Sequence, residues 1–455
     1  MKFTGWRWFV SSLMLIAAAA TAETRPQYGG VLHVAMRGAP TSLDPADNAQ
    51  PDSFGRRSLT RLMFDTLVTT DGNGRIQPWL ATGWQSASGG QRWQFRIRPG
   101  VKFHDGTTLT AEIAAASLRD ANPGWNVVAD AESLSIALEK PDPDLPEELA
   151  LSRNAIALRS SSSQPGGTGA FHLVEWQPGK RLSLAAEENC WRGRPFLDAI
   201  EIEMGKSVRD QLTALELGKA DVVEVAPEQV RRFSQDKRRL VSSNSVELLA
   251  LVFTRDASSP EEKLLRQALA LSVDRASIRS VLLQGAGQAA GGILPNWMSG
   301  YEFVFSTDPD LARARQARQQ AGRVPNWTLG YDGNDPLARL LAERVTLNAK
   351  DAGLVLQPAA GVAGDLRLMR IPLEAPDAWI ALAGVAPLAG LPAVEHRASE
   401  EDLYGAETAL LGTQRVIPLF HLPASYVGAA GLENWVLQTD GSWTVADAWW
   451  GMANK

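Results

Sequence analysis

The residues that could do covalent or metal chemistry are few and scattered along the chain. The five histidines stand at positions 33, 104, 172, 396 and 421, and no two have the i,i+4 spacing that places two imidazoles on one helix face. No H-E-x-x-H, G-x-S-x-G, P-loop or C-x-x-C motif occurs. Cys190 is the single cysteine and cannot form an internal disulfide. The sequence therefore predicts no enzyme, no metal site and no cofactor, with a zinc site assembled by the fold as the alternative.

Tryptophan is the residue type that points most clearly to binding. The chain has 15 tryptophans, and we expect most of them to lie in hydrophobic cores. Trp297 follows a Pro-Asn pair in a predicted loop, and Trp379 lies in a region without a clear periodic pattern. Aromatic walls suit a site that encloses varied solutes, because they bury apolar area without leaving polar groups unpaired. We therefore take Trp297 and Trp379 as candidate ligand contacts.

One stretch, residues 78–112, has the clearest local pattern. Trp93, Phe95 and Ile97 alternate with polar residues, as in a half-buried β-strand. Pro-Gly and Asp-Gly turns follow, with a short second strand between them, and Thr110 can then cap a helix. All of these features predict structural roles.

The segments PWLATGW and WQFRIRPGVKFHDGTTLTAE in this stretch resemble the signature of family 5 extracellular solute-binding proteins, the periplasmic peptide- and nickel-binding receptors of ABC importers. The resemblance covers roughly residues 29–355 and 405–450. The chain departs from the family pattern at Ile113, where relatives carry an acidic residue that completes the helix cap. It also departs across residues 361–400, where relatives have an acidic, Pro-bearing, aromatic loop over the ligand.

The resemblance implies an α/β fold, that of the two-lobed periplasmic binding protein of type II in its large three-domain variant, with a hinge and a ligand cleft between the lobes. Lobe 1 would be discontinuous and comprise residues 23–65, 166–247 and 405–455. A small inserted domain, residues 66–165, would sit on lobe 1, and residues 248–404 would form lobe 2. Two chain crossings would make the hinge, so that ligand binding closes the lobes.

The resemblance also implies positions for ligand contacts. Arg37 leaves the first strand, where relatives line the cleft, and its guanidinium could hold a carboxylate bidentately, with a salt bridge at the rim as the alternative. His421 ends the apolar run VIPLF, where the returning strand would pass the cleft near the hinge. Relatives that bind peptides hold the free amine with an acidic residue, for which Asp377 is the nearest substitute. Together with Trp297 and Trp379, these residues form the predicted site.

Several other elements can be predicted from local patterns. Residues 31–36 are apolar on both alternating faces, which predicts a strand buried on both sides. Residues 54–68 have leucines at helical spacing. Helix caps are expected at Ser207, at Asp274 and at the Asp335-Pro336 pair.

The N-terminus is typical of a cleaved secretory signal, residues 1–22, with basic residues, an apolar run and an A-x-A cleavage site. An uncleaved anchor is the alternative. No cysteine follows the apolar run, so we expect no lipid attachment and a mature protein free in the periplasm. The net charge of −6 argues against sequence-independent nucleic-acid binding.

We therefore expect a periplasmic receptor of an ABC-type importer, which captures oligopeptides by lobe closure and delivers them to a permease and ATPase complex in the inner membrane. A monomer is expected. The shortened insert and the unmatched loop leave a sensor or a degenerate interaction protein of the same fold as an alternative. A binder of a nickel chelate or another non-peptide solute, and thirdly an enzyme, also stay open.

Overall fold

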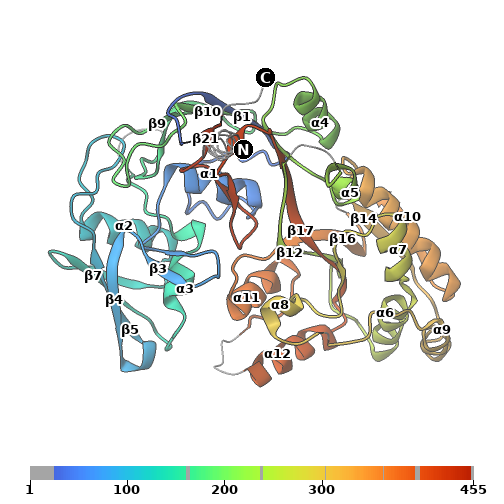
Figure 1. Ribbon diagram of the computed structural model, residues 1–455. Helices are drawn as coiled ribbons and strands as arrows, with labels where there is room; N and C mark the ends of the chain where they lie inside the picture. The colour runs from blue at the N-terminus through green and yellow to red at the C-terminus, as the bar shows by residue number, and fades with distance from the viewer. Residues whose placement is uncertain are drawn as a thin grey trace, which may run out of the picture.

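The computed structural model describes residues 25–159, 164–235, 239–302, 304–361, 363–394 and 400–451. The predicted signal segment and His396 lie outside these ranges. Within them, no helix combines the length and the apolar character needed to cross a bilayer. The molecule has two lobes joined by long central strands, and a smaller domain is attached to the first lobe (Figure 1).

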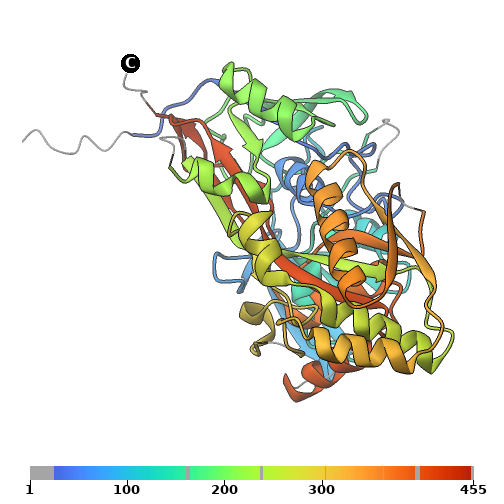
Figure 2. The same ribbon diagram turned by 90° about the vertical axis from the view of Figure 1, so that its right-hand side faces the viewer.

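One sheet runs through both lobes, with the strand order β15-β14-β16-β12-β17-β11-β1-β10-β9-β8 and with β13 paired to β17 outside this order. Two long strands, β12 (Arg239–Phe253) and β17 (Val416–Gly428), run antiparallel through its middle and connect the lobes (Figure 2). The remaining strands of this sheet are β1 (Val31–Ala35), β8 (Phe171–Gln177), β9 (Arg181–Ala186), β10 (Ala199–Glu203), β11 (Val222–Glu224), β13 (Gln288–Ala289), β14 (Asn326–Tyr331), β15 (Val355–Ala360) and β16 (Leu366–Pro372).

The first lobe packs around strands β1 and β8 to β11. Its core joins sheet residues such as Phe171 to Trp435 and Trp443 near the C-terminus, all three almost fully buried. Its other elements are α1 (Phe54–Met63), α4 (Val208–Glu216), η3 (Pro227–Gln229), α5 (Val230–Phe233), β18 (Leu432–Glu433), β19 (Val436–Leu437), β20 (Trp443–Thr444) and β21 (Trp449–Trp450). The predicted Ser207 cap of α4 is confirmed, since the Asp210 amide donates to its hydroxyl at 3.1 Å.

Two predictions for this lobe are wrong in part. Strand β1 is buried on both sides only at its end, because Val31 and His33 are exposed whereas Ala35, on the same face, is buried. The helix predicted over residues 54–68 ends at Met63, since Phe64 is extended and donates the last helical hydrogen bond to Thr60. Leucine spacing alone could not show this end.

The inserted domain confirms most of the pattern of residues 78–112, but the predicted short second strand is reduced to a single bridge between Lys102 and Thr108. Strand β5 (Arg92–Ile97) buries Trp93, Phe95 and Ile97, and Thr110 accepts the Ile113 amide at 3.2 Å at the start of α2 (Ala111–Ala121). Its four-stranded sheet has the order β4-β5-β7-β6. The other elements are β2 (Val68–Thr70), β3 (Ile76–Pro78), β4 (Ala81–Ala87), η1 (Ser88–Gly90), β6 (Asn126–Ala129), β7 (Ser133–Ala137), α3 (Leu145–Leu149) and η2 (Ser152–Asn154).

A buried carboxylate joins the inserted domain to lobe 1. Asp65 accepts hydrogen bonds from the indole nitrogens of Trp79 at 2.7 Å and Trp191 at 3.0 Å, and from the Thr168 hydroxyl at 2.8 Å. The two indoles meet edge to face with their centroids 5.3 Å apart. Because the three donors come from distant parts of the sequence, Asp65 fixes the chain where it enters the insert.

Helices cover both faces of the sheet in lobe 2. Leu249, Leu251 and Phe253 of β12 pack on one face, while the alternating residues Leu248 and Ala250 pack on the other. Alternation on a strand buried on both sides explains why this segment is apolar throughout. The helices are α6 (Pro260–Ser272), α7 (Arg275–Val281), α8 (Asn296–Ser299), α9 (Leu311–Gln320), α10 (Pro336–Asp351), α11 (Ala378–Leu388) and α12 (Glu400–Gly412). The predicted caps at Asp274 and Asp335 are both present.

The hinge lies where β12 and β17 pass between the lobes. Their pairing shifts register between Ser242 and Glu247, opposite Pro423. Leu403, Leu410 and other residues before this point pack in the lobe 2 core. The division of the chain into lobes and insert stays a prediction, in which Leu410, beyond the predicted boundary at 405, packs with lobe 2 residues.

Candidate functional site

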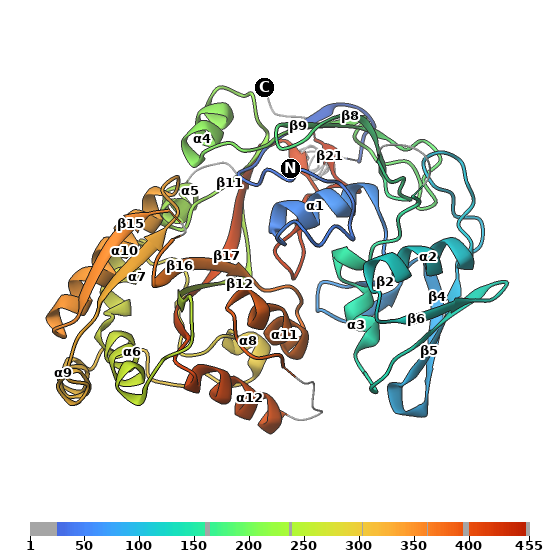
Figure 3. The same ribbon diagram turned by 180° about the vertical axis from the view of Figure 1, so that it is seen from behind.

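A cavity of about 870 Å³ lies between the two lobes. Lobe 1 lines it with the end of β1, residues 52–55 and residues 205–210. Lobe 2 contributes the start of α10 and part of β16, and hinge residues 422–426 lie between them. Figure 3 shows from behind how the central strands run from the first lobe, with β8, β9 and α1, into the second lobe, with α6, α8 and α12. This volume is within the range of about 300–1,000 Å³ that is usual for small-molecule sites.

Arg37 extends into this cavity from the end of β1, and 41% of its side chain is exposed. Its Nε lies 3.5 Å from Glu224 Oε2, and its Nη1 lies 3.7 Å from Asp335 Oδ2. Glu224 ends β11 in lobe 1, whereas Asp335 precedes α10 in lobe 2. Arg37 thus faces a carboxylate from each lobe, at separations longer than ordinary hydrogen bonds.

A second arginine of the cavity is firmly held. Arg370 of β16 donates from Nε and Nη2 to Glu247 Oε2 at 2.8 and 2.5 Å. Burial opposes the charge of Arg370, but Glu247 beside it holds the guanidinium pKa above its ordinary value. Asp335 lies 3.8 Å from the same arginine and also caps α10, where Oδ1 accepts the Leu337 amide at 2.9 Å. The charges of both lobes therefore form one cluster.

Burial shifts the pKa values of two titratable groups in the cavity wall, Glu224 and Tyr426. Burial raises the pKa of Glu224 above its usual range, and the nearby Arg37 guanidinium only partly opposes this effect. Burial, together with the charges of Glu224 and Asp440, also raises the pKa of Tyr426, which lines the cavity from the hinge. The tyrosine hydroxyl therefore keeps its proton.

The rest of the wall is mixed. Apolar side chains such as Phe54, Leu249, Leu341 and Leu422 line it between the charged groups. The cavity can accordingly hold a solute with apolar parts and with charged groups at separate positions.

Of the five residues predicted as ligand contacts, only Arg37 lines this cavity. His421 is buried, with Nε2 within 3.0 Å of the Ile293 carbonyl oxygen, and burial lowers its pKa to about 4. The sequence indicated that His421 lies near the hinge, which is its position on β17, but its side chain packs in the protein interior. Its neighbour Leu422 lines the cavity instead.

The other three predicted contacts also lie outside the cavity wall. Trp297 of α8 donates from Nε1 to the Ser245 carbonyl oxygen at 2.9 Å. Asp377 caps α11, where its Oδ1 accepts the Ile380 amide at 2.9 Å. Trp379 is partly buried against the cluster that joins α11 and α12 to the sheet. In this arrangement of the lobes none of them faces the space that a solute would fill, and their part in binding stays a prediction.

Sequence reasoning missed Glu224, Glu247, Asp335, Arg370 and Tyr426. One signal was available, because Glu247 is a single charge in the apolar run VELLALVF, and a charge buried in a strand requires a partner. The sequence predicts Asp335 as a helix cap, but a cap uses one carboxylate oxygen and leaves the second free for another role. The other three become neighbours only through strand order.

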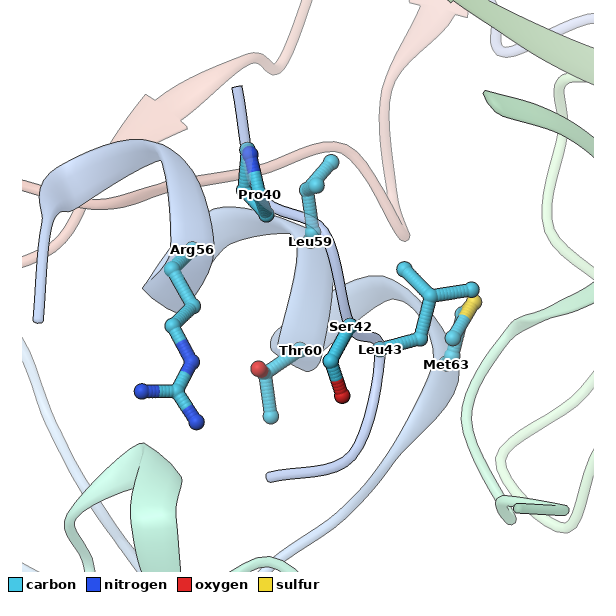
Figure 4. Close-up of a pocket in the computed structure, with 7 residues that line it drawn as sticks. All are labelled: Pro40, Ser42, Leu43, Arg56, Leu59, Thr60 and Met63. Atoms are coloured by element: carbon cyan, nitrogen blue, oxygen red, sulfur yellow. The ribbon is translucent and has the colours of Figure 1, made fainter. Parts of the chain in front are cut away.

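Two further features bear on where a ligand could bind. A hollow of about 10 Å³ beside α1, lined by residues such as Arg56, Leu59 and Thr60, has room for about one water molecule (Figure 4). In the part of the chain that the structure describes, no group of three or more histidine, cysteine or acidic residues could hold a metal ion. The interlobe cavity is therefore the candidate site.

Comparison with known proteins agrees with this architecture. Residues 75–363 match the model of the bacterial extracellular solute-binding proteins, family 5. Protein XP55 of Streptomyces lividans is 24% identical over 387 residues, 76% of this chain and 71% of that protein.

Two solved structures have the same fold. A dipeptide-binding protein from Pseudoalteromonas sp. SM9913 in complex with Met-Leu has a TM-score of 0.81 and 16% identity, and the match covers 92% of this chain and 100% of that one. NikA from Staphylococcus aureus in complex with Ni(L-His)2 has a TM-score of 0.80 and 15% identity, covering 92% and 99%. The fold is thus the two-lobed α/β fold of periplasmic binding proteins.

The family consists of solute-binding proteins rather than enzymes. Its model matches well over half of the chain, including the strand, turn and capped helix of the signature stretch. The chain belongs to the bacterial extracellular solute-binding proteins of family 5.

Proposed function

We propose that the protein is the receptor of an ABC-type importer that captures an oligopeptide between its lobes and delivers it to a permease and ATPase complex. The observation that carries this proposal is the interlobe cavity, whose walls bring charges from both lobes together beside the hinge. A solute that contacts both lobes favours the closed arrangement, because only that arrangement provides both sets of contacts.

The peptide assignment is supported by the mixed chemistry of the wall. A peptide carries an ammonium, a carboxylate and apolar side chains, and the cavity offers carboxylates, arginines and leucines. The dipeptide complex of a protein with the same fold supports the same class. Within the cavity, Arg37 is the proposed contact for a carboxylate, since its guanidinium is partly exposed and loosely paired.

A nickel chelate is the second candidate. It is favoured by the fold shared with a protein solved in complex with Ni(L-His)2. The chelate would enter as a complete solute, and its histidine carboxylates could contact Arg37.

Thermal-shift screening of the purified protein against a tripeptide library, nickel–histidine and simple sugars tests the proposal. We expect stabilisation by peptides, and Arg37→Ala should weaken their binding by about tenfold or more, as loss of a charged hydrogen bond does. Arg313→Ala, at an exposed arginine of α9 outside the cavity, is the matched control and should bind as wild type. Stabilisation by nickel–histidine alone would favour the second candidate, and stabilisation by none of these solutes would contradict the proposal.

We also propose that the mature chain is a monomer in the periplasm, cleaved after Ala22 and without a lipid. Mass spectrometry of a periplasmic extract should find Glu23 as the first residue. A different first residue, or recovery from the cytoplasm, would contradict this proposal.

A further inference from the structure

The hinge end of the cavity carries more negative than positive groups. Six carboxylates line the whole cavity against four basic side chains. The basic residues include Lys206, which pairs with Glu203 at 2.9 Å, and Arg370, which is occupied by Glu247. Near the hinge, Arg37 is the nearest cation to Glu224, and it shares Asp335 with Arg370, whose Nη1 lies 3.8 Å from that carboxylate.

Arg37 does not satisfy these two carboxylates. Its nitrogens lie 3.5 Å from Glu224 and 3.7 Å from Asp335, beyond the usual hydrogen-bond length for such pairs. Together, Arg37 and Arg370 carry two positive charges, whereas three carboxylates, those of Glu224, Glu247 and Asp335, lie beside them. The local excess is therefore an open position for a second cation.

Independent observations mark the same place. Tyr426 lines the cavity and is only 3% exposed, yet no hydrogen bond to its hydroxyl is found within the described ranges. Glu228, which is close enough to Asp335, Arg37 and Arg370 to be affected by their charges, has a buried carboxylate oxygen without a partner in the same ranges. Buried polar groups are normally paired, so the unpaired Glu228 oxygen beside an excess of carboxylates indicates a missing partner, and the Tyr426 side chain lies at the cavity wall nearby.

We propose that the hinge end of the cavity binds a positively charged group of the solute, an ammonium or a guanidinium, between Glu224 of lobe 1 and Asp335 of lobe 2, with the Tyr426 hydroxyl as a further acceptor. This inference rests on the proposed function, because it assigns a chemical class to the solute of the same cavity. A cation held between the lobes adds an attraction that only the closed arrangement provides in full.

Binding of the cation is coupled to pH. Burial raises the pKa of Glu224 in the free protein, and a bound cation lowers it again. Binding therefore releases a proton wherever the free carboxyl holds one, and affinity decreases as the pH falls through the pKa of the free protein. The facing charged groups are Arg37, Arg370, Glu228, Glu247 and Asp335.

Isothermal titration with peptides that differ by one positive charge tests the inference. The probes are Ala-Lys-Ala, Ala-Gln-Ala and N-acetylated Ala-Gln-Ala. In the wild type, removal of the lysine charge or of the terminal amine should weaken binding by about tenfold or more. In Glu224→Gln the same removal should cost less than about threefold, and Tyr426→Phe should weaken the best peptide by about tenfold. Glu343→Gln, at an exposed position of α10, is the matched control and should behave as wild type.

The outcomes separate this inference from the proposed function. Peptides that bind with no dependence on either positive charge would overturn the cation site and leave the receptor function intact. The cation site would also be overturned if Glu224→Gln and Tyr426→Phe, both shown by circular dichroism to be folded, bind the peptides with the same dependence on positive charge as the wild type. If no peptide binds, the titration is repeated with the amines spermidine and agmatine in place of the peptides. Binding of these amines that is lost in Glu224→Gln supports the cation site without the peptide assignment, and no binding of either class overturns the inference.

Discussion

At the residue scale, Arg57 shows how a buried charged side chain is held by definite structural partners. Arg57 is almost fully buried, and its guanidinium donates to Asp52 and to the carbonyl oxygens of Leu373 and Asp440. Leu373 belongs to lobe 2, so this single side chain also links α1 to the other lobe. A buried charge is tolerated when its donors are used in this way, and the removal of one partner is costly.

Asp65 gives a prediction of this kind. Asp65→Asn keeps the shape of the side chain but turns one acceptor into an NH2 group that faces an indole N–H or a hydroxyl. We expect a loss of about 1.5–3 kcal/mol in the free energy of unfolding, the range for a hydrogen bond to a charged group. Urea unfolding measures the change. Asp130→Asn, in an exposed turn, is the control and should stay within about 0.5 kcal/mol of wild type. If Asp130→Asn loses as much free energy of unfolding as Asp65→Asn, the loss is not specific to the hydrogen bonds of Asp65.

His421 gives a prediction about pH. Its pKa is about 4 in the folded protein, below the ordinary value of 6.5, because burial disfavours the imidazolium. Between these values the unfolded chain binds a proton that the folded chain does not, so stability decreases as the pH is lowered from about 6.5 toward 4. The whole effect is of the order of 3 kcal/mol. Comparison of the wild type with His421→Gln isolates this residue, since the variant should lack that part of the slope. Parallel curves would show that His421 titrates normally.

At the element scale, caps determine where helices begin more sharply than apolar spacing determines where they end. Thr110, Ser207 and Asp335 all accept amides of the first helical turn, as the sequence predicted. The end of α1 could not be predicted from local helix preference. The chain after Met63 is extended, and Asp65 there bonds to Trp79 of the inserted domain.

Removal of a cap should therefore have a moderate effect. Thr110→Ala leaves the Ile113 amide without its acceptor, and we expect a loss of about 1 kcal/mol in the free energy of unfolding. The capping box is incomplete here, so no reciprocal side chain from position 113 compensates. Thr108→Ala, two residues earlier and exposed, is the control for loss of a threonine hydroxyl. If Thr110→Ala and Thr108→Ala unfold at the same denaturant concentration, Thr110 does not stabilise the helix as a cap.

The candidate site shows the limit of sequence reasoning at this scale. The order of strands, in which β11 lies between β1 and β17, brings Arg37, Glu224 and Tyr426 to one end of the cavity. These residues are far apart in the sequence, and no local pattern pairs them. Arg37 could be predicted because it ends a recognisable strand. The direction of the His421 side chain could not, because neighbouring residues of a strand point to opposite faces and a shift of one residue exchanges them.

At the scale of the whole molecule, two contacts between the lobes add to the hydrogen bond from Arg57 to the Leu373 carbonyl oxygen. Arg37 faces Asp335 across the cavity, and the inserted domain contacts lobe 2 directly. In that second contact Arg153 pairs with Glu374, and Leu151, Ala375 and Ile380 form a small apolar cluster. Figure 1 shows α3 and α11 facing one another there. Separation of the lobes must break both contacts, so both contribute to the balance between open and closed forms.

The second contact yields a prediction about that balance. Ile380→Asp places a charge in the apolar cluster, three residues after Asp377, whose charge already acts on Glu147, a carboxyl whose pKa burial raises to about 7. The contact should weaken, the unliganded protein should open, and small-angle X-ray scattering should give a larger radius of gyration. A ligand that binds only the closed form has an apparent Kd equal to its intrinsic Kd divided by the fraction of closed molecules. A smaller closed fraction should therefore raise the apparent Kd by the same factor. Leu388→Asp introduces the same charge at an exposed position of the same helix and should leave both quantities unchanged. If the two variants scatter alike, the contact between the inserted domain and lobe 2 does not hold the molecule closed.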